Sequence, residues 1–131
     1  MASKITAIRR YRPEIKRMRT MQTNLMVESI AMRTGLNEGE IRFVVYEIRD
    51  ALLTAHRIGQ AVKIEGLGTF SPTIRADGRF DILFRPDPRL LDQLNHTTKM
   101  SATILNKKHI GKSADELVQL WNEEHPEDKV G

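Results

Sequence analysis

The hydrophobic period of this chain changes near Gly59, and this change constrains the fold more than any other feature of the sequence. Before it, apolar residues recur at helical spacing across residues 41–55. After it, Val62 and Ile64 alternate with charged neighbours, which is the pattern of a half-buried strand. The sequence therefore predicts a long helix over residues 37–58, followed by a β-sheet.

A shorter helix is expected just before the long one, over residues 24–34. Thr23 is placed to cap its start, and Gly35 to end it in the left-handed conformation. Leu25 and Ile30 are expected on its buried face. The long helix then opens with a variant of the capping box in which asparagine is the capping residue.

Three short strands joined by tight turns are expected after the long helix. Residues 66–68 form the first connection, and residues 69–75 the second strand. Residues 76–78 read Ala-Asp-Gly, and we expect a hairpin turn there because Asp-Gly readily adopts positive φ. Residues 79–85 form the third strand, and a proline at the first helical position begins a short helix over residues 89–94.

The flanking segments are harder to assign from their sequence. For residues 4–22 we expect an edge strand or an extended arm, because Pro13 prevents an uninterrupted helix through the segment. The apolar residues 102–105 indicate another strand. A capping box at Ser113–Glu116 predicts a helix over about residues 113–124.

Two helices and a three-stranded meander cannot close a core alone, since the long helix has more apolar surface than one small sheet covers. A second copy of the chain is the simplest cover, and an obligate dimer interface buries upward of about 2,000 Å². We therefore expect a homodimer built on residues 23–95. Its core is expected to contain Ile41, Val45, Ile48, Leu52 and Phe70.

The formal net charge of +4 is unevenly distributed along the chain. Residues 1–22 carry seven Lys and Arg side chains against a single acidic residue, Glu14. Residues 23–95 and residues 96–131 each carry one more acidic than basic side chain. A basic segment of this kind favours nucleic acid or another acidic surface as partner. The alternative is a solvated tail that only raises solubility.

The order of the expected elements and several local motifs resemble the family of HU and integration host factor. The motifs that match are Ile30-Ala31 with Gly35-Leu36-Asn37, Val62-Lys63-Ile64 with Gly66-Leu67-Gly68-Thr69-Phe70, and Phe84-Arg85 with Leu90, Asp92 and Asn95. The resemblance covers about residues 23–95. It implies an α+β fold: two N-terminal helices, a three-stranded antiparallel sheet with a β-arm and a short third helix, to which this chain adds a C-terminal helix.

The resemblance divides the chain into a basic N-terminal extension (1–22), an HU-like dimerisation and DNA-binding domain (23–95) and a C-terminal extension (96–131). One departure from the family is large. Its long β-arm, whose tip carries an Arg-Asn-Pro wedge that kinks DNA, has no room between Phe70 and Phe84. The chain more closely resembles the short-armed HU-like domains of some larger bacterial proteins.

Basic residues in three regions are the candidates for contact with DNA phosphates. They are Arg9, Arg10, Arg12, Lys16, Arg17 and Arg19 in the N-terminal segment, Arg75, Arg79, Arg85 and Arg89 along the hairpin and the end of the third strand, and Lys107 and Lys108 in the C-terminal extension. For Arg75 and Arg79 the alternative is a cross-strand charge cluster with Asp77 and Asp81.

Other classes of function find little support. The chain has no cysteine, and its four histidines are scattered, so we expect no catalytic site, no metal site and no cofactor. We also expect no membrane span and no secretory signal. An organelle transit peptide is a minor alternative for the Arg-rich start.

We expect a sequence-tolerant, histone-like protein of the cytoplasmic nucleoid that binds and condenses double-stranded DNA as a homodimer. The alternative is an arm-less structural module that holds protein partners through its extensions and no longer binds DNA.

Overall fold

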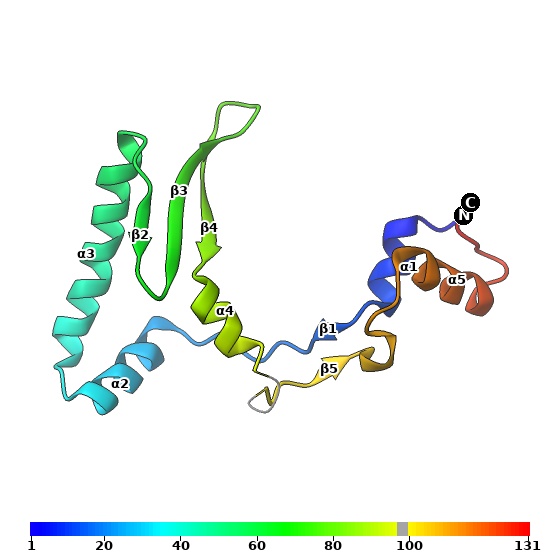
Figure 1. The fold of residues 1–131 in the computed structure, drawn as a ribbon, viewed down its shortest axis with the longest axis horizontal. Coiled ribbons are helices and arrows are strands. Elements are labelled where there is room, and N and C mark those ends of the chain that lie inside the picture. Colours follow the sequence, from blue (N-terminus) through cyan, green and yellow to red (C-terminus); the bar gives the residue numbers. More distant parts are fainter. Residues whose placement is uncertain (97–99) are drawn as a thin grey trace. The chain divides into compact units, whose positions relative to one another are not determined.

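The computed structural model describes residues 1–96 and 100–131. The chain divides into two compact units (Figure 1). The central unit comprises Thr20–Met100, and the terminal unit combines Met1–Arg19 with Ser101–Gly131. The two segments that flank the expected HU-like domain therefore fold together.

The central unit opens with two helices, α2 (Thr23–Thr34) and α3 (Glu38–Arg57). Gly35 ends α2 in the left-handed conformation, with φ of 75°, as expected from the sequence. The predicted cap of α3 is also confirmed. The side-chain oxygen of Asn37 accepts hydrogen bonds from the backbone N–H groups of the second and third residues of the helix, at 2.8 and 3.4 Å.

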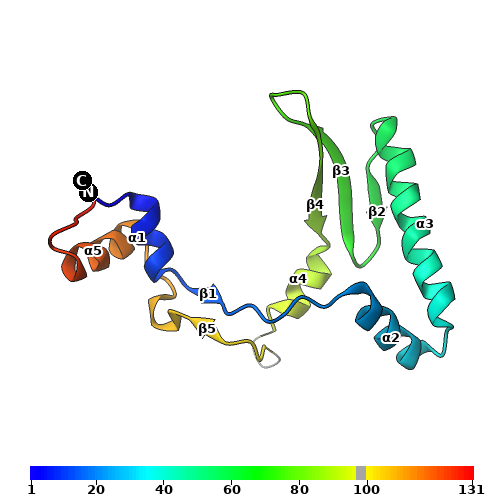
Figure 2. The same ribbon diagram turned by 180° about the vertical axis from the view of Figure 1, so that it is seen from behind.

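An antiparallel sheet follows, with the strand order β2 (Val62–Ile64), β3 (Gly68–Ile74) and β4 (Phe80–Pro86). α3 runs alongside β2 in both views, and α4 (Pro88–Leu94) leaves the end of β4 (Figure 1 and Figure 2). The mixed helix and antiparallel-sheet architecture is the α+β fold predicted from the sequence, with a short β3–β4 hairpin in place of a long arm.

Gly68 shows why the turn between β2 and β3 needs glycine. A Cβ atom at this position would lie 2.6 Å from the ring of Phe84 and would collide with the carbonyl oxygen of Arg85. No real Cβ approaches other atoms so closely, so the close passage of β3 and β4 depends on the missing side chain. Gly68, the second glycine of Gly66-Leu67-Gly68, therefore has a structural role.

In the terminal unit, α1 (Lys4–Tyr11) packs against α5 (Ala114–Glu124). β1 (Glu14–Ile15) pairs in antiparallel fashion with β5 (Ile104–Leu105). A 3₁₀ helix, η2 (Lys107–His109), connects β5 to the segment that leads into α5. The strand expected within residues 102–105 and the helix expected near residues 113–124 are both present.

Aromatic side chains fill the core of the terminal unit. Tyr11 is only 5% exposed, and its ring makes edge contacts with His109 and Trp121, at centroid distances of 5.8 and 6.5 Å. Its hydroxyl donates a hydrogen bond to the carboxylate of Glu124. Burial, reinforced by this bond, raises the pKa of Tyr11 above its ordinary value of 10.0. A single chain thus closes this small core.

The central unit buries much less of its apolar surface. Among its described residues, Val27 and Ile41 are the buried apolar side chains. Phe43 on α3 is 64% exposed and Phe80 on β4 is 85% exposed. Of the residues expected in the dimer core, Ile41 is buried in the single chain; Val45, Leu52 and Phe70 are half-buried, and Ile48 is exposed.

Two details of the predicted elements are wrong. Residues 4–11 are helical rather than extended, because Ser3 caps the helix by accepting the N–H of Thr6 and Pro13 lies beyond its last turn. Only β1 fulfils the strand prediction for this segment. Thr23 lies inside α2 and does not cap it; Gln22 precedes the helix without a side-chain cap.

The buried face of α2 also differs from the prediction. Val27 is its fully buried residue, whereas Leu25 is 53% exposed in the single chain and Ile30 is half-buried. The sequence period placed apolar residues correctly on the helix, but it did not rank them by burial.

Candidate nucleic-acid interface

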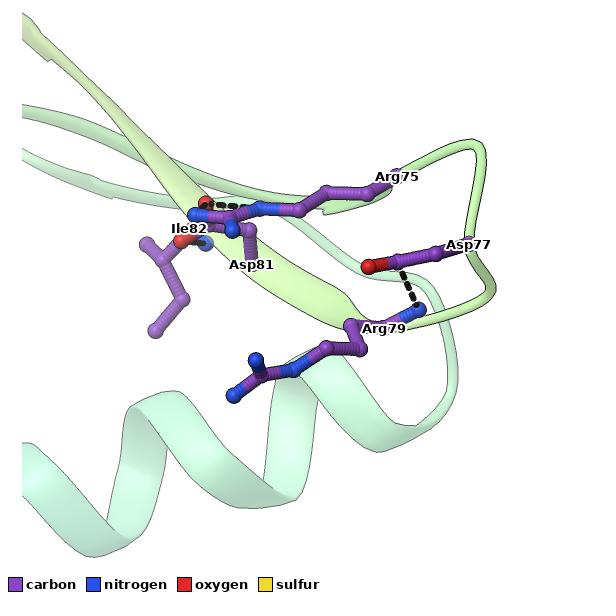
Figure 3. A network of polar contacts seen from close by, with 5 residues as sticks. All are labelled: Arg75, Asp77, Arg79, Asp81 and Ile82. Atoms are coloured by element: carbon purple, nitrogen blue, oxygen red, sulfur yellow. Dashed lines mark hydrogen bonds and ion pairs between the residues drawn. The ribbon is translucent and has the colours of Figure 1, made fainter.

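The tip of the β3–β4 hairpin holds a network of charged side chains (Figure 3). The guanidinium of Arg75 donates two hydrogen bonds to one carboxylate oxygen of Asp81, at 3.0 and 2.6 Å. These bonds hold the pKa of Asp81 below its ordinary value. Arg75 therefore already has an anionic partner within the chain, as in the charge cluster considered as an alternative to phosphate contact.

Asp77 and Arg79 behave differently from this pair. The carboxylate of Asp77 accepts the backbone N–H of Arg79 at 3.0 Å, which closes the turn. The guanidinium of Arg79 points away from Asp77 (Figure 3). Of the two arginines at the hairpin, Arg79 is thus the one whose charge is directed away from the turn.

The sheet has one apolar and one polar face. Residues directly opposite each other in neighbouring strands share a face, and the register pairs Thr69 with Lys63 and with Arg85, and Ser71 with Leu83. The opposite face carries the apolar set Val62, Ile64, Phe70, Pro72, Ile82 and Phe84. Two cations and three hydroxyl groups, the third that of Thr73, therefore share the polar face with Leu83 and the carboxylate of Asp81. The cations and hydroxyls are groups that donate hydrogen bonds to phosphate.

Arg89, at the start of α4, is tied to the protein by two carboxylates. Its guanidinium lies 3.7 Å from Glu65 and 3.7 Å from Asp87. Asp87 is buried and accepts the backbone N–H groups of Arg89 and Gly66, at 2.9 and 3.2 Å. The first of these bonds is the largest cause of the lowered pKa of Asp87. This network fixes the β2–β3 turn against α4, so Arg89 has a structural role in addition to its charge.

The terminal unit carries the excess of positive charge. It contains eleven Lys and Arg side chains and seven Asp and Glu side chains, whereas the central unit contains ten of each. The net charge of the whole chain therefore belongs to the terminal unit. Arg9 and Arg10 lie in the last turn of α1, and Arg12, Lys16, Arg17 and Arg19 follow it as exposed residues.

The structure brings together two of the basic groups that are far apart in the sequence. The side-chain amide of Asn106 donates hydrogen bonds to the carbonyl oxygens of Arg10 and Arg12, both at 3.0 Å. Lys107 and Lys108 follow Asn106 directly in η2. The N-terminal arginines and the C-terminal lysines thus lie on neighbouring backbone segments of one unit.

Sequence reasoning missed Lys63 and Asn106. Lys63 could have been found by continuing the strand alternation across the sheet, because it lies opposite Thr69. Asn106 gave no signal, since its role depends on a contact across 96 residues of chain. No group of acidic or histidine side chains able to hold a metal ion occurs in the described part of the chain.

A comparison with protein families gives a match over residues 4–81 to the family HU-HIG, described as an HU domain fused to wHTH, Ig or glycine-rich motif. This match covers more than half of the chain. The protein belongs to the HU-HIG family. The HU-HIG match begins within α1, so it reaches further toward the N-terminus than the resemblance noted in the sequence.

Among solved structures, a mutant of HU from Thermotoga maritima is similar to this HU-HIG protein, with 19% identity and a TM-score of 0.49. The similarity covers 56% of this chain and 99% of the HU chain. No curated protein sequence matches the chain.

Membership of the HU-HIG family places the chain among HU-like proteins, an architectural, histone-like class of DNA-binding proteins that are not enzymes. None of the helices in residues 1–96 and 100–131 is long and apolar enough to cross a membrane.

Proposed function

We propose that the protein is a sequence-tolerant architectural DNA-binding protein of the cytoplasmic nucleoid that acts as a homodimer. The observation that carries this proposal is the distribution of charge around an HU-type fold: the central unit is neutral, and the terminal unit holds the entire net charge of +4. A cationic surface of this kind attracts the phosphate backbone without reading its sequence.

The exposed apolar surface of the central unit supports the homodimer. A hollow between α3 and the β3–β4 hairpin is lined by the apolar side chains of Leu53, Pro72, Phe80 and Ile82, together with His56, Arg57 and Asp81. Phe43 and Phe80, 64% and 85% exposed, lie on the same unit, and exposed apolar surface of this kind is typical of an interaction site. A second copy, placed against α3 and the sheet, would remove this surface from water.

An unsatisfied ring nitrogen of His56 also supports a second copy at this surface. Its Nδ1 atom lies 2.9 Å from the carbonyl oxygen of Gln60, so this nitrogen carries the proton and donates. Its Nε2 atom is buried and finds no hydrogen-bond partner among the described residues. A buried acceptor without a donor is costly, and a donor from a second copy would satisfy it.

The residues proposed to contact phosphates lie in both units. They are Arg9, Arg10, Arg12, Lys16, Arg17, Arg19, Lys107 and Lys108 in the terminal unit, and Arg75, Arg79, Arg85 and Arg89 in the central unit, to which we add Lys63 on the polar face of the sheet. We expect the terminal unit to contribute most of the affinity, because Arg75 and Arg89 are shared with carboxylates.

A salt titration of the intact chain with two unrelated duplexes of equal length tests this proposal. Affinity should fall linearly with salt on logarithmic axes, with the same steep slope for both duplexes, because phosphate contacts release counterions. Light scattering in the same buffers should give twice the mass of the 15.0 kDa chain. A strong preference for one duplex, or a folded monomer at micromolar concentration, would contradict the proposal.

The second candidate function is a protein-interaction module that has kept the HU-type fold without DNA binding. The internal pairing of Arg75 with Asp81 at the hairpin favours it, because the arm that holds DNA in the family is here short and partly neutralised. No binding to either duplex at low salt, by a protein that remains a folded dimer, would establish this alternative over the first.

A further inference from the structure

Asn106 joins segments from opposite ends of the sequence. Its side-chain amide donates to the carbonyl oxygens of Arg10 and Arg12, both at 3.0 Å. Its backbone adopts the left-handed conformation, with φ of 56° and ψ of 34°, and no other non-glycine residue in the described part of the chain has positive φ. Asparagine tolerates this conformation better than most residues, so position 106 satisfies a backbone and a side-chain requirement together.

His109 makes a second connection next to the first. Its Nδ1 atom lies 2.6 Å from the carbonyl oxygen of Tyr11, and because a carbonyl only accepts, this ring nitrogen donates. The side chain is 6% exposed, and its backbone N–H bonds to the carbonyl oxygen of Asn106 at 2.9 Å. Residues 106 and 109 therefore hold three successive carbonyl groups at the end of α1.

These two connections fix four cations on adjacent backbone segments. Lys107 and Lys108 lie between the two connecting residues and are exposed, as are Arg10 and Arg12. The carbonyl oxygens that would repel an approaching anion are occupied by the Asn106 amide and the His109 ring. These carbonyl oxygens are therefore not free to oppose an anion that approaches the exposed cations.

The carboxylates of the terminal unit neutralise this surface only in part. Glu14 lies 3.8 Å from Arg12, but Asp115 pairs with Lys4, and Glu124 accepts the Tyr11 hydroxyl. An excess of like charge on one small unit disfavours the folded state unless counter-charge binds. A chain of phosphates spaced along a duplex supplies such counter-charge at several points.

We propose that the two ends of this sequence form one composite phosphate-binding surface for duplex DNA, made by Arg10, Arg12, Lys107 and Lys108, and that Asn106 is its positioning residue. This inference rests on the proposed DNA-binding function and deepens it. Neither basic group acts independently: the lysines add to the affinity only while Asn106 holds them beside the arginines.

The test uses the full chain and three sets of variants. Asn106→Gly keeps the left-handed backbone but removes the amide, and it leaves the charge unchanged. Lys107→Gln/Lys108→Gln removes the C-terminal cations, and Arg10→Gln/Arg12→Gln removes the N-terminal cations. Removal of one cation that binds a phosphate should lower the slope of log affinity against log salt by about one. We expect the lysine pair to lower it by about two, and Asn106→Gly to weaken binding several-fold without any change of charge.

Coupling between the groups distinguishes a composite surface from two separate ones. In the otherwise unchanged chain, the effects of the arginine and lysine pairs on affinity should be non-additive. In the Asn106→Gly background the lysine pair should have little effect of its own, so the coupling should disappear, because the lysines are no longer held beside the arginines. Additive effects in both backgrounds, or an Asn106→Gly protein with unchanged affinity and slope, would overturn the proposal.

Two controls separate loss of the composite surface from general loss of charge and from unfolding of the terminal unit. Lys129→Gln removes one exposed charge from the same unit, in the segment after α5 and outside the four proposed residues, and it should leave the slope nearly unchanged. Trp121, the single tryptophan of the chain, packs against Tyr11 and reports by fluorescence whether the terminal unit stays folded. If Asn106→Gly alters the emission of Trp121, that variant no longer tests the proposal. The salt slopes of Lys107→Gln/Lys108→Gln and Lys129→Gln then test it alone.

Two further outcomes are informative. Competition by millimolar inorganic phosphate at constant ionic strength would show a site for free phosphate and contradict a duplex surface. If the unaltered protein fails to bind duplex at low salt, the proposed function itself is wrong; if it binds while the lysine and asparagine variants bind equally well, only the composite surface is wrong.

Discussion

The central and terminal units differ in how much of their apolar surface a single chain can bury. The terminal unit closes around Tyr11, with Ala7 and Leu117 buried beside it and Trp121 against its ring. The central unit is larger, yet the side chains of Phe43 and Phe80 remain mostly exposed. The smaller unit thus closes an aromatic core within one chain, while the larger one leaves Phe43 and Phe80 on its surface.

The two units also differ in net charge. The unit with more exposed apolar surface is neutral, and the unit with the closed core is positive. The exposed apolar surface lies on the neutral unit. A net charge there would repel a second copy and oppose association. The positive unit has the closed core and presents cations to the solvent. We therefore propose that self-association and attraction of an anionic partner belong to separate parts of the chain. The following experiments test whether this separation holds.

The largest expected effect is that of Ile48→Glu on the central unit. Ile48 is 42% exposed in the single chain, and a homodimer would bury it. An unpaired buried charge costs about 3–5 kcal/mol, so we expect loss of the dimer and a large drop in the melting temperature. Size-exclusion chromatography with light scattering measures the first, and circular dichroism the second.

Ile48→Val is the matched control, with an expected cost of about 1 kcal/mol and an intact dimer. The environment of Trp121 should be the same in both variants, since it belongs to the other unit. If Ile48→Glu leaves a stable dimer, the exposed face of α3 is not the dimer interface.

Phe70→Ala should have the next largest effect. The ring of Phe70 packs against Phe84 at a centroid distance of 4.7 Å but is only half-buried in the single chain. If a second copy completes its burial, truncation should cost about 3–5 kcal/mol in chemical denaturation. A melting temperature equal to that of the unaltered protein would refute the structural role assigned to this residue.

Tyr11→Phe tests the terminal unit at a smaller scale. It removes the hydrogen bond to Glu124 and should cost about 1 kcal/mol, detected as earlier loss of the Trp121 signal in denaturant. The dimer should be unaffected.

Tyr11 also predicts a pH dependence. Its pKa is raised in the folded state, so the neutral phenol contributes stability that is present below pH 10.0 and is lost as the pH rises through the raised pKa. Alkaline loss of the Trp121 signal should be weaker in Tyr11→Phe. Identical alkaline transitions in the two proteins would contradict this assignment.

The smallest effect is expected for Asp81→Asn at the hairpin. The change removes the carboxylate that binds Arg75, and the freed guanidinium becomes available to a phosphate. The salt slope of DNA binding should steepen by up to about one, with little change in overall fold. Asp77→Asn is a poor substitute, because Asp77 closes the turn. An unchanged slope would show that the hairpin does not touch the duplex.

The central unit was largely predictable because its determinants are local. Gly35 and Asn37 mark helix ends, and the alternation around Val62 and the Asp77-Gly78 turn indicate strands within a few residues of one another. The helix α1 was missed because Pro13 was read as an interruption within a long segment, when it lies just after a short helix.

The candidate site was predictable only in part. The basic residues themselves are visible in the sequence, but their grouping is not. The amide of Asn106 and the ring of His109 bind carbonyl groups about a hundred residues away, and backbone carbonyls carry no residue-specific signal. The pairing of Arg75 with Asp81 was foreseen as one of two alternatives, because cross-strand neighbours at a short turn lie within reach of each other.

The pairing of β1 with β5 has a consequence for the order of events during protein synthesis. The ribosome releases residues 20–100 before residues 101–131, and folding during translation proceeds at about 5–20 residues per second. The central unit can therefore fold while its N-terminal neighbour still lacks the strand and helix that complete it. If the chain forms the proposed homodimer, a nascent chain becomes competent to pair with another chain a few seconds before it acquires its assembled cationic surface.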